Sequence, residues 1–386
     1  MSWIKTFIQI IVISLLTVIL IDSIAFFSFK SKIQSIIPSY GTSITNFDRG
    51  YPRYHFMRDN EIGFDIRPNF KTSTSTKPRE YKKYSVWGNS YGCFDNEWKN
   101  EDTRGGVYLA GDSFTWGYVS YERKFGTLLK QLISRPVYSC GVTHTGQKHQ
   151  FEKFKRLFED GINPSLLIVN IVSNDLNNDF FFPHTTIVDG YMVETVEQCG
   201  EMETDSHSVR KDTYDDAKIN VKNALNKPKS FRSLLSEYSL TAHILAINSR
   251  KLRSQLNFKV INQKNKCRKS ISGDKPKNLG IEYSNSKLSQ VNRDVIVDWI
   301  NHASENNYKI IFSFIPDKYS NSVNYPFIEK FIKSNGGLVI SFKEHISSNN
   351  IDRQSLYYKN NGHFNEKGNN EYAHFLEMSI TELSEF

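Results

Sequence analysis

The sequence contains few cysteines and lacks the patterns of a metal site. Its 386 residues include four cysteines, at positions 93, 140, 199 and 267. They form no C-x-x-C pair, and no histidine–cysteine cluster has metal-ligand spacing, so no bound metal is expected. Cys199 and Cys267 lie in the same middle segment and would be able to pair in an oxidising compartment. Four free thiols fit the sequence equally well.

The chain also lacks the features of a nucleic-acid-binding protein. It has no arginine-rich arm and no zinc-finger spacing, so nucleic acid is not an expected partner. Lysine plus arginine outnumber aspartate plus glutamate by 49 to 41, a formal net charge of +8. This thin excess predicts an ordinary basic surface, and attraction to an anionic glycan or lipid is the alternative. The hydrophobic content of 39% is sufficient for a packed core.

Residues 6–29 predict a membrane segment at the amino end. They are rich in Ile, Val, Leu and Phe and contain one charged residue, Asp22. A helix of about 20 apolar residues spans the hydrocarbon layer, so the length favours a single-pass anchor over residues 1–29. A cleavable signal peptide is the alternative, because small residues at 23–25 suit signal peptidase. Lysines flank both ends and do not set the orientation.

The rest of the chain predicts short strands alternating with helices. Residues 30–104 form an irregular lead-in that is expected to pack on a main domain, residues 105–386. In that domain, short apolar runs predict strands at 107–110, 137–140, 166–172, 309–315 and 338–342. Apolar residues at helical spacing predict helices at 125–133, 151–158, 288–300, 327–333 and 366–383. Such alternation is typical of an α/β fold with a mostly parallel sheet covered on both faces.

The alternating pattern stops between residues 183 and 285. This stretch is polar, with lysine and asparagine in excess, and holds one amphipathic candidate at 231–247. It is interpreted as an insertion or a lid.

Two glycine-containing motifs follow the first two predicted strands of the main domain. Gly111-Asp112-Ser113 comes between a strand and a helix, which places Ser113 at the carboxyl edge of the sheet, where open α/β sheets bind ligands. Gly141 ends the next strand, and its N–H group would be able to donate to an oxyanion. A helix N-cap and an ordinary turn are the simpler explanations of these motifs.

Two further motifs carry an amide and an imidazole. Asn174, in Ser173-Asn174-Asp175, directly follows the most apolar strand and would be a further oxyanion donor. His363, in Asn360-Asn361-Gly362-His363, precedes the last helix and would act as a base only if the end of the chain folds back against Ser113. Taken alone, each is explained as well by a polar turn or a capping histidine.

Together, the motifs Gly-Asp-Ser, Gly, Asn-Asp and Gly-His-Phe-Asn-x-x-Gly resemble the SGNH (GDSL) hydrolase family. The resemblance covers residues 107–179 and 309–386, roughly half of the chain. Residues 61–69 and 89–92 are similar to the segment before the nucleophile in membrane-anchored members. The family resemblance implies a three-layer α/β/α sandwich of flavodoxin-like type, with the catalytic domain outside the cytoplasm.

The resemblance also implies a set of roles. Ser113 attacks an acyl carbonyl, and His363 acts as general base and then general acid. The backbone N–H groups of Ser113 and Gly141 and the side chain of Asn174 form the oxyanion hole. Asp112 and Asp175 are the supporting neighbours of these groups. No metal and no organic cofactor is needed.

The sequence departs from the family at the position that orients the histidine. Members usually carry an aspartate two or three residues earlier, where this chain has Asn361 and Asn360. An asparagine carbonyl can hold the histidine tautomer, but it has no charge to stabilise the imidazolium. Three interpretations stay open: a Ser-His dyad, an acid from elsewhere such as Asp352, or a weak or lapsed enzyme.

Two activities would share one acyl-enzyme on Ser113. If water attacks the acyl-enzyme, the protein is an esterase or deacetylase. If a sugar hydroxyl attacks it, the protein is an O-acyltransferase. Residues 315–319 resemble a segment of polysaccharide O-acetyltransferases, which together with the membrane segment points to cell-envelope glycans. The prediction is a hydrolase acting on an acylated carbohydrate or other ester. The transferase and a catalytically lapsed glycan-binding module are the alternatives.

Overall fold

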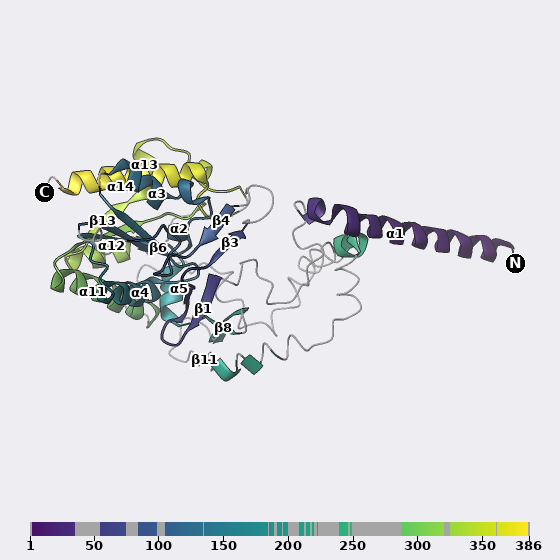
Figure 1. Ribbon diagram of the computed structural model, residues 1–386, viewed down its shortest axis with the longest axis horizontal. Coiled ribbons are helices and arrows are strands. Elements are labelled where there is room, and N and C mark those ends of the chain that lie inside the picture. The colour runs from purple at the N-terminus through teal and green to yellow at the C-terminus, as the bar shows by residue number, and fades with distance from the viewer. Residues whose placement is uncertain are drawn as a thin grey trace. The chain divides into compact units, whose positions relative to one another are not determined.

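The computed structural model describes two units of the chain (Figure 1). One unit comprises residues 1–51, 75–81 and 197–274, and the other comprises residues 52–74, 82–196 and 275–386. The described residues are 2–34, 55–74, 84–98, 105–133, 135–183, 287–319, 325–359 and 361–384, with short pieces between 185 and 248.

A five-stranded parallel sheet forms the centre of the larger unit. Its strands are β5 (Val107–Gly111), β6 (Val137–Gly141), β7 (Leu166–Ile171), β12 (Lys309–Phe314) and β13 (Leu338–Ser341). They lie in the order β13-β12-β7-β5-β6, and every pair is parallel. Counted along the chain, this is the 2-1-3-4-5 order of flavodoxin-like sheets, which changes direction between β5 and β7. The predicted α/β class and parallel sheet are confirmed.

Helices cover both faces of this sheet (Figure 1). One face packs against α4 (Gln147–Glu159), α5 (Asp175–Phe180), α11 (Lys287–Glu305) and α12 (Tyr325–Ser334). The other packs against α3 (Phe125–Leu132), α13 (Phe342–Ser348) and α14 (Glu366–Ser384). Three short helices lie in the connections: α2 (Ser113–Trp116), η3 (Tyr121–Arg123) and η5 (Arg353–Leu356).

The strands are apolar throughout because both of their faces are buried. Successive side chains of a strand point to opposite faces. In β5, Tyr108 packs in the core that contains Trp299 of α11. Its neighbour Leu109 packs in the core that contains Phe125 of α3. Each of these side chains is at most 1% exposed. Continuous apolar runs are the expected signature of such strands.

The lead-in is more regular than the sequence indicates. It contains two antiparallel hairpins, one formed by β1 (Phe56–Asp59) and β2 (Gly63–Ile66) and one by β3 (Lys71–Thr74) and β4 (Tyr84–Trp87). Each strand has four residues, which is too short to show an alternating pattern. The expectation of an irregular lead-in is therefore wrong for these residues.

The insertion also contains short strands. They are β8 (Thr185–Val188), β9 (Tyr191–Glu194), β10 (Val196–Cys199) and β11 (Ser208–Lys211), paired as β8-β9 and β10-β11. Of the amphipathic candidate at 231–247, residues 239–245 are described, and 240–245 are helical.

Two helix boundaries differ from the predicted ones for physical reasons. Helix α4 begins at Gln147 instead of residue 151, because its first turn buries polar side chains, which give no apolar signal. Phe342 was predicted to end a strand, but it begins α13 and is buried. A single apolar residue at a junction fits either element.

Helix α1 (Ser2–Gln34) contains an apolar stretch of 27 residues, Trp3–Phe29. By length and composition it is able to cross a membrane, either as a single anchor or as a signal sequence. Most of its large side chains are exposed within the structure, Leu16 by 60% for example. A helix that is apolar all round and exposed to its surroundings is suited to lipid.

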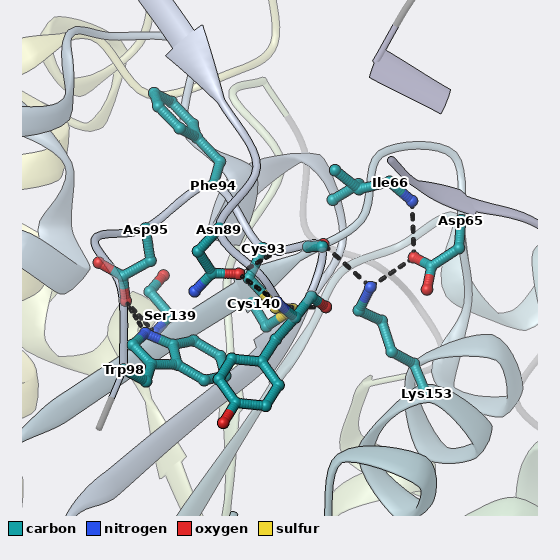
Figure 2. The surroundings of a disulfide bond; sticks show 12 residues. Asp65, Ile66, Asn89, Cys93, Phe94, Asp95, Trp98, Ser139, Cys140 and Lys153 are labelled. Carbon is teal, nitrogen blue, oxygen red and sulfur yellow. Dashed lines mark hydrogen bonds and ion pairs between the residues drawn. A yellow bond between two sulfur atoms is a disulfide. The ribbon is translucent and has the colours of Figure 1, made fainter. Parts of the chain in front are cut away.

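Cys93 and Cys140 form a disulfide (Figure 2), with their Cα atoms 4.8 Å apart. The interpretation of four free thiols is wrong for this pair, because local sequence patterns do not show that two residues 47 positions apart meet. The proposed pairing of Cys199 with Cys267 falls outside the described side chains and stays a prediction.

Candidate active site

Ser113 lies where the sheet changes direction. Strand β5 ends at Gly111, and Ser113 begins the four-residue helix α2. Between them, Asp112 caps the helix, since its Oδ1 accepts the N–H of Phe114 at 2.9 Å. Ser113 is 9% exposed. The N-cap expected as an alternative is therefore present at Asp112, and the Ser113 hydroxyl is not the group that caps the helix.

His363 reaches Ser113 from the far end of the chain. Its Nε2 lies 2.7 Å from Ser113 Oγ, although 250 positions separate the two residues. A tight loop before α14 presents the ring. Across this loop Tyr358 N donates to His363 O at 3.0 Å, and Tyr357 bridges to Phe364. The loop backbone thus holds the imidazole against the hydroxyl of Ser113.

Asn361 determines which nitrogen of His363 carries the proton. The backbone N–H of His363 donates to Asn361 Oδ1 at 3.1 Å, which identifies that atom as the carbonyl oxygen. The same oxygen lies 2.5 Å from His363 Nδ1. A carbonyl oxygen only accepts, so Nδ1 must carry the hydrogen. Nε2 then has a free lone pair directed at the Ser113 hydroxyl, which is the arrangement needed to remove its proton.

The surroundings of His363 keep its imidazole neutral. Burial, together with the nearby His144, lowers the pKa of His363 to about 4. The ring of Tyr118 lies 4.4 Å from the imidazole centroid and that of Phe114 lies 5.1 Å away. These rings remove water from the imidazole and disfavour its charged form. The imidazole of His363 is therefore neutral near pH 7, and its protonated form is poorly stabilised.

A carboxylate lies behind the serine. Ser113 Oγ is also 3.0 Å from Asp112 Oδ2, and Asn174 Nδ2 is 3.5 Å from the same oxygen. Burial raises the pKa of Asp112, and its hydrogen bonds to Phe114 and Ser113 act in the opposite direction. Asn174 is exposed at the surface of the site. Its amide and the Ser113 hydroxyl therefore lie near the same carboxylate oxygen.

Gly141 packs directly beneath the serine turn. A Cβ atom at this position would lie 2.1 Å from Trp116 N and 2.7 Å from Asp112 O. Neither contact is possible, and both neighbours are backbone atoms that cannot move aside independently. Only glycine allows β6 and the Ser113 turn to approach this closely.

The lead-in fastens the edge strand β6, which ends at Gly141 (Figure 2). Besides the disulfide at Cys140, the carboxylate of Asp95 accepts the Ser139 N–H at 2.9 Å and the Trp98 indole N–H at 3.0 Å. An edge strand presents unpaired backbone groups, and here the lead-in satisfies one of them. The lead-in thereby supports the strand end that forms one side of the site.

Asp175, predicted as a supporting residue, and Asp352, named as a possible acid for His363, bond to other groups. Asp175 accepts the Val172 N–H at 3.0 Å and Gln147 Nε2 at 2.7 Å, and burial, then Asp112 and Asp179, raise its pKa well above the usual value. Asp352 caps η5 by accepting the N–H of Gln354 at 3.1 Å. Within the described residues the ring Nδ1 of His363 is bonded to Asn361. Asn360 lies outside the described residues.

Lys318 lies in the segment 315–319 that the sequence singled out, but its structural role was not predicted. Its side chain is 6% exposed, and its Nζ donates to Tyr358 O at 2.9 Å and to Lys359 O at 2.7 Å. Next to it, Pro316 O accepts the hydroxyl of Tyr357. The segment at 315–319 therefore supports the loop that carries His363. The position of this segment directly after a predicted strand was the one sequence feature that indicated a place near the site.

A second unpredicted feature is a network of buried, hydrogen-bonded polar side chains next to the turn that carries Ser113. Asn170 of β7 donates to Ala110 O at 3.0 Å and to Thr115 Oγ1 at 2.9 Å, and it accepts the Tyr372 hydroxyl at 2.6 Å. Tyr372 OH is also 2.6 Å from Ser313 Oγ. A fully bonded buried network of this kind specifies one arrangement of the elements it joins. It connects α2, β7 and α14, the elements around Ser113 and His363.

Comparison with known proteins finds similarity at the level of solved structures. No protein-family model matches the sequence, and no curated protein sequence matches it. A protein assigned to the G-D-S-L lipolytic family from Desulfitobacterium hafniense is 13% identical, with a TM-score of 0.35 over 72% of this chain and 98% of that chain. An acetyl xylan esterase is 12% identical, with a TM-score of 0.35 over 71% and 99%.

A GDSL-like lipase from Bacteroides thetaiotaomicron is 10% identical, with a TM-score of 0.35 over 74% of this chain and 91% of that chain. Similarity at this level supports no statement about the chemistry of this chain. Within the described part of the chain, no group of three or more histidine, cysteine or acidic side chains is placed to hold a metal ion.

Proposed function

We propose that this chain is a membrane-anchored serine esterase that cleaves acyl esters of cell-envelope glycans. The observation that carries the proposal is the contact of 2.7 Å between Ser113 Oγ and His363 Nε2, with the tautomer of His363 set by Asn361. A serine activated by an adjacent, oriented base is the general signature of covalent catalysis through an acyl-enzyme.

In the first half of the reaction, Ser113 Oγ attacks the acyl carbonyl carbon while His363 Nε2 takes the hydroxyl proton. The carbonyl oxygen becomes an oxyanion, to which the Asn174 amide and the backbone N–H groups of Ser113 and Gly141 would donate. Collapse of this intermediate breaks the bond to the leaving alcohol. His363 returns its proton to that alcohol, and the acyl group remains on Ser113.

In the second half, water attacks the acyl-enzyme by the same route. His363 removes a proton from the water, and the new oxyanion forms in the same place. Collapse breaks the bond between the acyl carbon and Ser113 Oγ and releases the carboxylic acid, while His363 returns its proton to Ser113 Oγ and restores the hydroxyl. The chemistry uses side chains and backbone of this chain alone.

Two features support the proposed location. The buried disulfide between Cys93 and Cys140 supports an oxidising compartment, because disulfides persist outside the cytoplasm. Helix α1 is long enough to anchor the chain to a membrane. Together they support a catalytic unit on the outer side of the membrane, where acylated envelope glycans are the accessible esters.

O-acyl transfer to a sugar hydroxyl is the second candidate. It would use the same acyl-enzyme, with an alcohol replacing water in the second half. The aromatic rings of Phe114 and Tyr118 beside His363 favour it, because they limit the access of water to the base. The place of residues 315–319 under the histidine loop agrees with their resemblance to O-acetyltransferases.

Turnover of nitrophenyl acetate with and without oligosaccharide tests these alternatives. Fast hydrolysis that sugar does not change supports the esterase. Slow hydrolysis that an oligosaccharide accelerates, with transfer of acetyl to sugar detected by mass, supports the transferase. Ser113→Ala should abolish either activity, whereas Ser347→Ala should not, because Ser347 bonds within its own helix at Lys343 O. Absence of both activities would support the lapsed glycan-binding module.

A further inference from the structure

Asp22 is a carboxylate within the apolar helix α1, and its side chain is buried. Its exposure is 7%, while its neighbours Ile21 and Ile24 are 55% and 47% exposed. Ala25, one turn further on, is also 7% exposed. One narrow face of an otherwise exposed helix is therefore occupied. An uncompensated aspartate is unfavourable in a membrane helix, so this carboxylate requires hydrogen-bond partners.

The partner comes from the insertion. The Ser239 hydroxyl donates to Asp22 Oδ2, and the N–H and hydroxyl of Thr241 each donate to Asp22 Oδ1 at 3.1 Å. Ser239 Oγ in turn accepts the N–H of Ala242 at 3.0 Å. Both carboxylate oxygens are thus satisfied by neutral donors from a segment more than 200 positions away in the sequence.

The segment has the composition of a chain that contacts lipid. Residues 238–247 contain no lysine, arginine, aspartate or glutamate, within an insertion otherwise rich in lysine. Ile244 and Leu245 are 41% and 64% exposed, beside a helix whose own side chains face outwards. Exposed apolar side chains that adjoin a membrane helix are stabilised if both enter the same layer.

The depth of Asp22 fits an interfacial position. It lies seven residues before Phe29, where the apolar stretch ends, which is about 10 Å at the helical rise of about 1.5 Å per residue. Amphipathic segments bury their apolar face about 5–10 Å into the boundary between headgroups and acyl chains. A segment bonded to Asp22 would lie in that boundary, at the end of α1 that leads to the catalytic unit.

We propose that residues 239–245 are a membrane-interface element that docks on α1 through Asp22, giving the chain a second contact with the bilayer. The docked arrangement requires that α1 is retained, because cleavage after Ala25 would remove the carboxylate that the segment binds. The inference is independent of the chemistry at Ser113.

The test attaches an environment-sensitive fluorophore to the cysteine of Leu245→Cys in the full-length chain. Cys199 and Cys267 are replaced by serine so that only this cysteine is labelled. The protein is reconstituted in vesicles of phosphatidylethanolamine and phosphatidylglycerol. The expected emission is blue-shifted and falls about twofold with spin-labelled lipid, because a probe some 5–10 Å into the layer meets the quencher. Intact mass should include residues 1–25. A water-like, unquenched probe or a chain cleaved after Ala25 would overturn the proposal.

Variants locate the interaction. Asp22→Ala, and separately Ser239→Ala with Thr241→Val, should each return the probe to a water-like emission. Ser23→Ala is the matched control, since its hydroxyl bonds to Ile19 O within α1 at 2.7 Å and it should change nothing. Thermal unfolding of the catalytic unit, followed in parallel, verifies that each variant is folded. If Asp22→Ala and the Ser239→Ala, Thr241→Val double variant are both folded and both keep the wild-type level of quenching, docking through Asp22 is excluded.

Discussion

An amide oxygen, that of Asn361, holds the His363 ring at Nδ1, while the opposite nitrogen faces Ser113 Oγ at 2.7 Å. The geometry of a catalytic triad is thus present without its negative charge. The neutral partner fixes the tautomer but leaves the imidazolium without compensation. Among the three interpretations left open by the sequence, the described contacts favour a Ser-His dyad oriented by asparagine.

Restoring the carboxylate should change the pH dependence. With the pKa of His363 lowered to about 4, kcat/KM of the wild type should fall on the acid side near pH 4. In Asn361→Asp the negative charge favours the imidazolium and raises this pKa, so the acid limb should move to higher pH. The rate at pH 7 should rise about 10-fold or more, because charge at this position is worth up to about 10⁴ in triad enzymes.

The matched control is Asn349→Asp. Asn349 lies 3.3 Å from the ring of His345, away from the serine, so the same added charge should leave the profile of kcat/KM unchanged. An acid limb that stays in place in Asn361→Asp would mean that His363 is not the titrating base.

Removing the Lys318 ammonium should slow turnover without weakening binding. Lys318→Met removes the ammonium donor from Tyr358 O, which keeps the N–H of Asn361 at 3.3 Å, and from Lys359 O. Leaving a buried carbonyl without a donor costs about 1–3 kcal/mol. The histidine loop should loosen, and kcat should fall about 10- to 100-fold with KM nearly unchanged. Lys330→Met, on the exposed side of α12, should match the wild type. Equal kinetics for the two variants would show that the loop does not need Lys318.

Adding one methyl group at Gly141 should abolish activity. In Gly141→Ala the new Cβ would overlap Trp116 N, so the serine turn or the strand end must shift and the oxyanion donors move with it. A loss of about 10²-fold or more in kcat is expected. At Gly362, a Cβ would meet nothing within 4 Å, so Gly362→Ala should fold and turn over normally. Full activity of Gly141→Ala would contradict the close packing described here.

Reduction of the disulfide should destabilise the catalytic unit. The Cys93–Cys140 bridge closes a loop of 47 positions, for which chain entropy predicts about 4 kcal/mol of stabilisation. The parent protein for this test carries Cys199→Ser and Cys267→Ser. Adding Cys93→Ser to this parent should lower the Tm of the catalytic unit. Treating the parent with reductant should lower its Tm by a similar amount. Insensitivity of the parent to reductant would show that the bridge does not form.

The central sheet was predictable because its strands are buried on both faces and read as continuous apolar runs. The four-residue hairpin strands of the lead-in and the polar first turn of α4 were not, since neither produces a clear periodicity. The motifs indicated Ser113, Gly141, Asn174 and His363 one at a time. Their spatial relationship, and the participation of Lys318 and Cys93, depend on long-range contacts that local patterns do not encode.

Covalent labelling of the serine tests the central claim most directly. The wild-type chain is treated with a fluorophosphonate, and the adduct is located by peptide mass. The account predicts a single adduct on Ser113, absent in Ser113→Ala and formed at least about 10²-fold more slowly in His363→Ala, since the base supplies that much of the activation. No adduct on folded wild-type protein, or one that forms equally fast without His363, would contradict it.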